Sequence, residues 1–174
     1  SIGGAGSVAG SLTLDGQGNS DAIFIMKFEG AFTVGANSSI NLINGATEAN
    51  VFWMAQGAIS VATDCDIKGT LFAHPGAVTL GANSTLKGRM FTSGGAISVA
   101  AGATAEMPDG IIAIPINCSG FDFPNPLLDV LGSVKNYAFF TSAGAVANAA
   151  TSGVICDIGS NFVAVSGFTT SVIF

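Results

Sequence analysis

The sequence predicts an all-β protein whose chain winds into a three-sided β-solenoid, with roughly 19 residues in each coil. Four similar segments start at Gly30, Gly57, Gly76 and Gly95, at spacings of 27, 19 and 19 residues. Nineteen extended residues trace about 60 Å, which suits one turn built from three short strands. Apolar residues alternate in short runs, and 24 of the 174 residues are glycine, so strands and turns are expected almost throughout.

Stacking such coils about 4.8 Å apart predicts ladders of equivalent residues. Strand alternation points every second side chain inward, so three apolar ladders are expected to form the core. Their members are Phe32, Ile59, Val78 and Ile97; Val34, Val61, Leu80 and Val99; and Ile40, Ile67 and Leu86. Between the first two ladders lies one hydroxyl residue per coil, which alternation points outward: Thr33, Ser60, Thr79 and Ser98.

The chain divides into three parts. Residues 1–107 carry the repeats and are expected to form the main coils, with about eight extra residues bulging near Asn44–Asn50 to account for the 27-residue spacing. Residues 108–130 are proline-rich and predict an irregular connection. Residues 131–174 return to alternation and predict terminal strands, which complete either this solenoid or that of a neighbouring subunit. Leu127–Val134 suits a short helix or a loop equally well.

Composition excludes several classes of function. Five basic and eleven acidic residues give a net charge of −6 without a basic patch, so nucleic acid is a poor partner. No uninterrupted apolar stretch is long enough to span a membrane. His74 is the only histidine, which excludes a multi-histidine metal site and leaves only a single-histidine arrangement, and we expect neither catalytic activity nor a metal or other cofactor. Low charge with abundant small residues is typical of extracellular β-proteins.

Six segments resemble the secreted ice-binding protein family, in the family's own order. They are Leu12–Gly18, Ala22–Phe28, Asn41–Ala46, Asn50–Trp53, Lys68–Ala73 and Lys87–Arg89. The resemblance implies a right-handed β-solenoid and a secreted or cell-surface protein. Segments of the tail, in Leu131–Phe140 and from Asp157 to Phe168, are similar to the family's first strands, and the family's cap helix has no counterpart. The chain is therefore either circularly permuted or spans the junction of two successive units.

The three cysteines are Cys65, Cys118 and Cys156. An extracellular β-protein permits disulfides, and a Cys65–Cys156 bridge across the permuted junction is one candidate. The odd count also leaves room for a bridge between subunits.

The sequence leaves three functions open. In the first, the protein is a non-enzymatic structural subunit that assembles head-to-tail with itself, by strand exchange, into a filament or adhesive surface layer, because open solenoid ends carry unpaired strands. The assembly segment would then contain Leu131, Tyr137, Phe139, Phe140, Phe162, Phe168 and Phe174. In the second, implied by the resemblance, the protein binds ice through the outward hydroxyls, with Ser39, Thr85 and Thr104 as a second rank. In the third, it is an adhesin domain that binds surface glycans.

Overall fold

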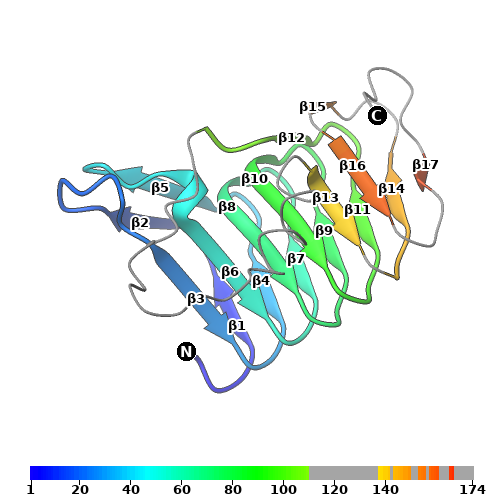
Figure 1. Ribbon diagram of the computed structural model, residues 1–174, viewed down its shortest axis with the longest axis horizontal. Helices are drawn as coiled ribbons and strands as arrows, with labels where there is room; N and C mark the ends of the chain where they lie inside the picture. Colours follow the sequence, from blue (N-terminus) through cyan, green and yellow to red (C-terminus); the bar gives the residue numbers. More distant parts are fainter. Residues whose placement is uncertain (110–136, 142, 150–152, 156, 161–164, 167–174) are drawn as a thin grey trace, which may run out of the picture.

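The computed structural model describes residues 1–109, 137–141, 143–149, 153–155, 157–160 and 165–166. The described strands lie side by side along the long axis, from β1 near the amino terminus at one end to β17 at the other (Figure 1). Every paired strand runs parallel to its neighbour, and the β-solenoid predicted from the repeats is confirmed.

One face of the solenoid is a seven-stranded parallel sheet of short strands, which we call the first face. Each coil contributes one strand to it, and the register follows the repeat, with Thr33 beside Ser60, Ser60 beside Thr79 and Thr79 beside Ser98. In spatial order the strands are β1 (Gly6–Val8), β4 (Phe32–Val34), β7 (Ile59–Val61), β9 (Val78–Leu80), β11 (Ile97–Val99), β14 (Val146–Asn148) and β17 (Val165–Ser166).

The remaining ten strands are hydrogen-bonded into one branched sheet that forms the other two faces. The second face contains β2 (Ser11–Asp15), β5 (Ser39–Ile43), the first half of β8 (Asp66–Ala73), the first half of β10 (Thr85–Thr92), β12 (Thr104–Glu106) and β15 (Gly153–Ile155). The third contains β3 (Phe24–Phe28), β6 (Val51–Ala55), the second halves of β8 and β10, β13 (Tyr137–Thr141) and β16 (Asp157–Ser160).

Two glycines mark the corner between the second and third faces. Gly69 in β8 and Gly88 in β10 are neighbours in the ladder, and a Cβ placed on Gly88 would lie 1.9 Å from the carbonyl oxygen of Gly69. Gly69 also has a φ of +103°, a conformation that side chains disfavour. The repeated Lys-Gly pair therefore allows successive coils to approach closely where long strands turn from one face to the next.

The core is a column of stacked apolar side chains running along the axis. All three predicted apolar ladders are buried, and no member is more than 4% exposed. Phe28, Phe32 and Trp53 add an aromatic stack, with ring centroids 4.5 and 5.1 Å apart. Burial of this kind stabilises by about 25 cal/mol per Å² of apolar surface, so the long ladders account for the regular shape.

The extra residues of the second coil form a loop, as predicted. It contains the short 3-10 helix η1 (Glu48–Asn50) and joins β5 to β6. Asn44 and Gly45 both have a positive φ, which suits the tight turn at its start. Ala49 and Asn50 are buried, so the loop is anchored on the body of the solenoid.

The described tail strands extend the chain's own solenoid. β13 pairs with β10, β14 with β11, and β15 with β12. The rest of the tail lies outside the described residues, so its placement in this solenoid or a neighbouring one stays a prediction. The proline-rich residues 110–130 and the segment Leu127–Val134 lie outside the described residues.

Candidate functional site

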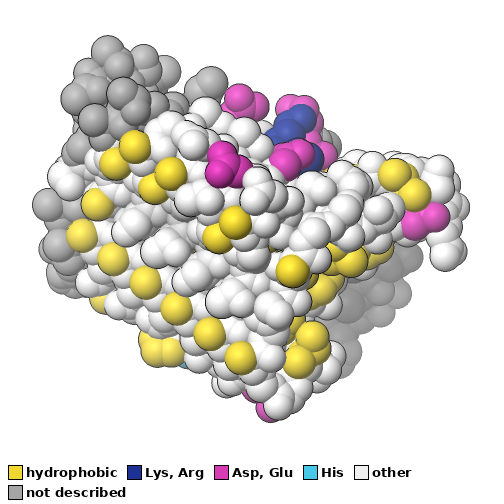
Figure 2. Space-filling model, turned by 180° about the vertical axis from the view of Figure 1, so that it is seen from behind, with side chains coloured by type: hydrophobic (Ala, Val, Ile, Leu, Met, Phe, Trp, Pro, Cys, Tyr) yellow, Lys and Arg dark blue, Asp and Glu magenta, His cyan; other side chains and the backbone are white. Residues whose placement is uncertain are grey.

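The outer surface of the first face consists of three parallel columns of small residues, which together we call the methyl–hydroxyl face (Figure 2). In Figure 2 small apolar side chains run across this side in regular rows. The central column holds one outward residue from each of the seven strands. Its members are Ser7, Thr33, Ser60, Thr79, Ser98, Ala147 and Ser166.

Two further columns flank the central one. In each strand their members lie two residues before and two residues after the central residue. The column before it is alanine throughout: Ala5, Ala31, Ala58, Ala77, Ala96 and Ala145. The column after it is alanine or glycine: Ala9, Gly35, Ala62, Gly81, Ala100 and Ala149. None of the three columns contains a charged side chain.

Regular strand spacing makes this surface a periodic array. Seven strands at about 4.8 Å give a length of about 29 Å, and three columns two residues apart give a width of about 13 Å. Ser7, Thr33 and Ser60 are exposed, whereas Thr79 and Ser98 are partly exposed. The predicted first rank of hydroxyls is thus brought together on one surface.

The predicted second rank lies elsewhere. Ser39 begins β5, Thr85 begins β10 and Thr104 begins β12, so all three are on the second face, beyond the corner that separates it from the first. They share their column with Asp66, because Ser39 pairs with Asp66 and Asp66 with Thr85. The expectation of a single two-rank array is therefore corrected to one rank on each of two faces.

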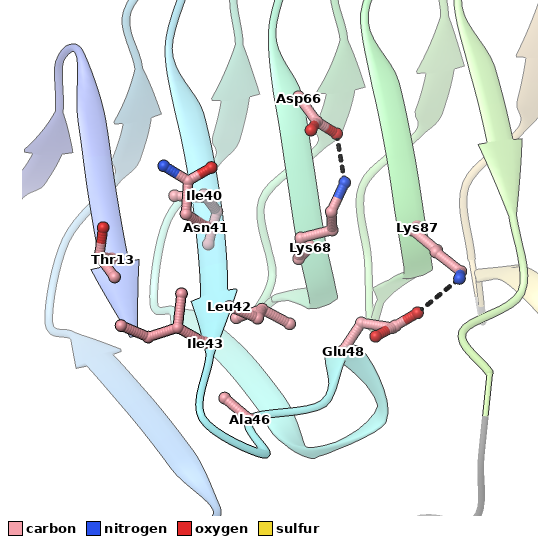
Figure 3. A pocket seen from close by; sticks show the side chains of 10 residues that line it. All are labelled: Thr13, Ile40, Asn41, Leu42, Ile43, Ala46, Glu48, Asp66, Lys68 and Lys87. Atoms are coloured by element: carbon pink, nitrogen blue, oxygen red, sulfur yellow. Dashed lines mark hydrogen bonds and ion pairs between the residues drawn. The ribbon is translucent and has the colours of Figure 1, made fainter. Parts of the chain in front are cut away.

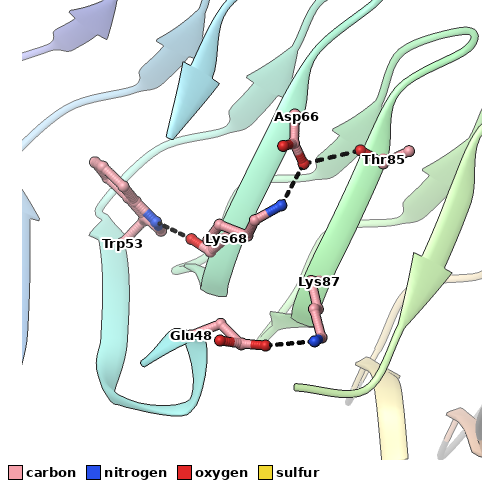
Figure 4. Close-up of polar contacts among 6 residues, drawn as sticks. All are labelled: Glu48, Trp53, Asp66, Lys68, Thr85 and Lys87. Carbon is pink, nitrogen blue, oxygen red and sulfur yellow. Dashed lines mark hydrogen bonds and ion pairs between the residues drawn. The ribbon is translucent and has the colours of Figure 1, made fainter. Parts of the chain in front are cut away.

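Charged side chains concentrate on the second face (Figure 4). Lys68 Nζ lies 2.5 Å from Asp66 Oδ1, and Thr85 donates a hydrogen bond of 3.0 Å to the same oxygen. Lys87 pairs with Glu48 of the loop at 2.8 Å and also with Asp109. Burial raises the pKa of the Glu48 carboxyl, but the hydrogen bond and charge of Lys87 outweigh that effect, so the pKa is lowered overall.

A groove of about 870 Å³ opens beside these charges, between β5 and β8 (Figure 3). It forms because β5 pairs with β8 only at Ser39 and Asp66 before the two strands separate. Apolar side chains of β5 and polar side chains of both strands line it. Its charged lining contrasts with the uncharged methyl–hydroxyl face.

The features that could suggest other chemistry have structural roles. Trp53 is 1% exposed, stacks on Phe32 and donates from Nε1 to the Lys68 carbonyl at 2.9 Å, so it belongs to the core. His74 is exposed at the turn after β8 and contacts the Ser93 hydroxyl. Within the described ranges, no group of three or more His, Cys, Asp or Glu residues could hold a metal ion.

Cys65 carries a free, buried thiol, which hydrogen-bonds to the Gly35 carbonyl at 3.1 Å. The candidate Cys65–Cys156 bridge is therefore not formed. Cys156 itself lies outside the described residues.

The residues of the predicted assembly segment divide into two groups. Phe139 is fully buried in the core of its own chain, and Tyr137 and Phe140 belong to β13, which pairs with β10 and β16. The others, Leu131, Phe162, Phe168 and Phe174, lie outside the described residues.

The sequence pattern identified four of the seven members of the central column and neither of the two flanking columns. The members it did not identify are Ser7, Ala147 and Ser166. A signal was present, because Gly-Ala precedes the strand, and Ala or Gly follows it, in the six coils that contain β1, β4, β7, β9, β11 and β14. That signal becomes visible only when strand register is used to carry the pattern beyond the aligned segments.

The fold and this surface define a parallel β-solenoid protein with one flat, uncharged, periodic face. Residues 2–104 match the Ice-binding-like family, which is more than half of the chain, and the chain belongs to that family. It is 42% identical over 65 residues to Ice-binding protein 1 of Shewanella frigidimarina (strain NCIMB 400). It also resembles the crystal structure of an ice binding protein from an Antarctic bacterium, Flavobacteriaceae, with a TM-score of 0.58 and 38% sequence identity.

These relatives are longer than this chain. The matched segment covers 37% of this chain and 7% of the Shewanella protein, whereas the structural match covers 95% of this chain and 38% of the other. Among the described residues, no helix is long and apolar enough to cross a membrane.

Proposed function

We propose that this protein binds ice through the methyl–hydroxyl face. The observation that carries the proposal is the register of the first face, which repeats a methyl, a hydroxyl and a second small group from one coil to the next. The family membership and the two relatives described as ice-binding proteins support it.

Ice binding needs a surface on which the groups that contact water are regularly spaced. Parallel strands hold the outward groups at a fixed spacing, so water bound along the column has a regular arrangement before it meets a crystal. Small methyl groups keep the surface flat and limit competing hydrogen bonds. Charged side chains would hold disordered hydration shells, and the three columns contain none, whereas the ion pairs of Lys68 and Lys87 lie on the neighbouring face.

The test compares one substitution on each face. We expect Thr79→Tyr to abolish thermal hysteresis and inhibition of ice recrystallisation, because a large ring at the centre of the array breaks its flatness. Thr85→Tyr places the same ring on the second face and should retain both activities. Far-UV circular dichroism checks that both variants keep the β-sheet spectrum.

The opposite pattern would overturn the choice of face. Activity that survives Thr79→Tyr and is lost in Thr85→Tyr would move ice binding to the column that contains Asp66. If the unsubstituted chain and both variants show no thermal hysteresis and no inhibition of ice recrystallisation, the ice-binding proposal is wrong.

We also propose that the protein is an extracellular structural subunit that assembles head-to-tail into a filament or an adhesive surface layer. The supporting observation is the end of the solenoid formed by β1, β2 and β3. The outer edges of β1 and β2 pair with no described strand, and among the described residues only Ile2 bridges the outer edge of β3, at Phe28. Unpaired edges of this kind recruit further strands. Because the described tail strands pair within their own chain, the assembly would use edge pairing rather than exchange of the tail.

Electron microscopy of the purified chain tests this second function. Long fibres one solenoid wide, which lengthen with protein concentration, are expected. Dispersed particles one solenoid long, at every concentration, would contradict it.

A further inference from the structure

The outward residues of the first face alternate between two kinds of coil. In the coils of β4 and β9 the central residue is threonine and the residue two positions later is glycine, whereas in the coils of β1, β7 and β11 these residues are serine and alanine. In spatial order the pairs are Ser7 and Ala9, Thr33 and Gly35, Ser60 and Ala62, Thr79 and Gly81, and Ser98 and Ala100. The alternation ends at β14, which has Ala147 and Ala149. The side chains of this face therefore repeat every two coils, about 9.6 Å, although the backbone repeats every coil.

The alternation moves one methyl group back and forth between two columns. With the alanine column included, each coil from β1 to β11 presents one hydroxyl and two methyl groups. In a threonine coil the second methyl is the γ-methyl of the central residue, and in a serine coil it belongs to the alanine that follows. The hydroxyls differ as well, because a γ-methyl restricts χ1 and holds the threonine hydroxyl in fewer orientations than a serine hydroxyl.

Packing between coils does not account for the glycine at position 35. A Cβ placed on Gly35 would meet Ala9 Cβ and Val8 O at 3.6 Å, which is an ordinary contact, and its φ is not positive. Gly81 differs, because a Cβ there would lie 2.3 Å from the Ala62 carbonyl oxygen. The missing methyl at Gly35 is therefore a property of the surface and not a requirement of the fold.

The inward residues of the threonine coils do not share the repeat. β4 and β9 have the same outward residues, but Phe32 corresponds to Val78, and Val34 corresponds to Leu80. In the serine coils β7 and β11 the whole strand is identical, Ile-Ser-Val. The outward residues thus keep the two-coil repeat even where the core departs from it.

We infer that the unit recognised by the methyl–hydroxyl face is two coils long, and that Thr33, Thr79 and Gly35 determine which plane of ice the protein binds. The inference deepens the ice binding proposed above and rests on it. A crystal surface meets equivalent groups along the face only where its own repeat matches that of the side chains, here about 9.6 Å along the solenoid axis. A surface matched to single coils meets a γ-methyl and a restricted hydroxyl at only every second site.

Two rearrangements of identical composition test the two-coil unit. The swap variant, Ser60→Thr/Thr79→Ser, gives the order Thr, Thr, Ser, Ser along β4, β7, β9 and β11 and destroys the repeat. The shifted variant, Thr33→Ser/Ser60→Thr/Thr79→Ser/Ser98→Thr, gives the order Ser, Thr, Ser, Thr and keeps it. Both retain one hydroxyl per coil and both leave Gly35 and Gly81 unchanged. The shifted variant contains both changes of the swap variant, so it is the matched control.

Thermal hysteresis should separate the two variants. We expect the swap variant to need at least about tenfold more protein than the unsubstituted chain for the same hysteresis, as expected from the loss of one or two hydrogen bonds through ordered water. The shifted variant should stay close to the unsubstituted chain. With a fluorescent label on lysine amines, which none of the three columns contains, the unsubstituted and shifted chains should coat the same planes of a single ice crystal, and the swap variant should not. Equal hysteresis of the swap and shifted variants, whether retained or lost, would overturn the two-coil unit.

Gly35→Ala tests the column that follows the hydroxyls. The added methyl breaks the repeat in that column, and the ordinary contacts at 3.6 Å allow the folded chain to accept it. We expect lower thermal hysteresis at an unchanged or higher Tm. The control, Gly3→Ala, adds a methyl outside the three columns with one contact at 3.7 Å and should leave the hysteresis unchanged. Hysteresis that is the same in both variants would contradict the role of Gly35.

The outcomes separate this inference from the function on which it rests. If the unsubstituted chain shows no thermal hysteresis, ice binding itself is wrong. If the unsubstituted chain is active and Thr79→Tyr is not, while the swap and shifted variants are equal, the face binds ice and the two-coil unit is wrong. Far-UV circular dichroism and thermal unfolding check that each variant is folded.

Discussion

Close stacking of the coils at Gly88 leads to a quantitative prediction for Gly88→Ala. An added Cβ would lie 1.9 Å from the Gly69 carbonyl oxygen and 2.6 Å from its carbonyl carbon, both backbone atoms of the neighbouring strand. Contacts below 3.0 Å force a shift, and here the shift must separate two coils. The φ of Gly88 is not positive, so the cost comes from crowding and not from backbone strain.

Overpacking of a tight site costs typically 1–3 kcal/mol, and a rigid backbone neighbour places Gly88→Ala near the upper end, at about 3 kcal/mol. For a chain of this length, each kcal/mol lowers Tm by roughly 2–4 °C, so we expect a fall of about 6–12 °C. Thermal unfolding followed by far-UV circular dichroism measures it.

Gly35→Ala is the matched control. A Cβ at Gly35 would meet Ala9 Cβ and Val8 O at 3.6 Å, an ordinary contact, and other coils already carry alanine at this position in Ala62 and Ala100. The substitution should be neutral or stabilising by about 0.4–1 kcal/mol, because it restricts the unfolded chain. A similar fall in Tm for both variants would refute the reasoning, since it would mean that coil spacing is uniform and that the glycine corner has no special role.

Two further predictions concern the second face and the buried thiol. Glu48 has a pKa below its ordinary value of 4.5 in the folded chain, so its ion pair with Lys87 stabilises the protein above that pH and is lost as the pH falls through the folded pKa. Urea unfolding should therefore show Glu48→Gln less stable than the unsubstituted chain by about 0.2–1 kcal/mol at pH 7. The difference should shrink as the pH falls below 4.5, and a difference that is constant across this range would contradict the prediction. Cys65→Ser should change stability by less than about 1 kcal/mol, because the equivalent positions of adjacent coils are already serine, Ser38 and Ser84. A large loss of stability on denaturant unfolding would show that the thiol does more than occupy the corner.

Much of the fold could be predicted from the sequence because a solenoid repeats one local solution. Each coil meets the same neighbours as the coil before it, so a 19-residue period identifies both the strands and the buried ladders led by Phe32, Val34 and Ile40. The loop near Asn44–Asn50 was predictable for the same reason, as a departure from that period.

The candidate site was predictable only in part. Alternation along a strand shows which side chains leave the core, so the outward direction of Thr33, Ser60, Thr79 and Ser98 follows from the sequence. It does not show where the chain turns a corner, and the four residues between Val34 and Ser39 place the second rank on a different face.

The sequence by itself determined that this protein is a stack of parallel coils with a hydroxyl column on its outside, because repetition and alternation are local properties of the chain. Only the tertiary structure decided that small alanine and glycine columns flank those hydroxyls and that the ion pairs of Lys68 and Lys87 lie on the neighbouring face. Those properties depend on register between residues 19 or more positions apart, and register is fixed by the packing of whole coils.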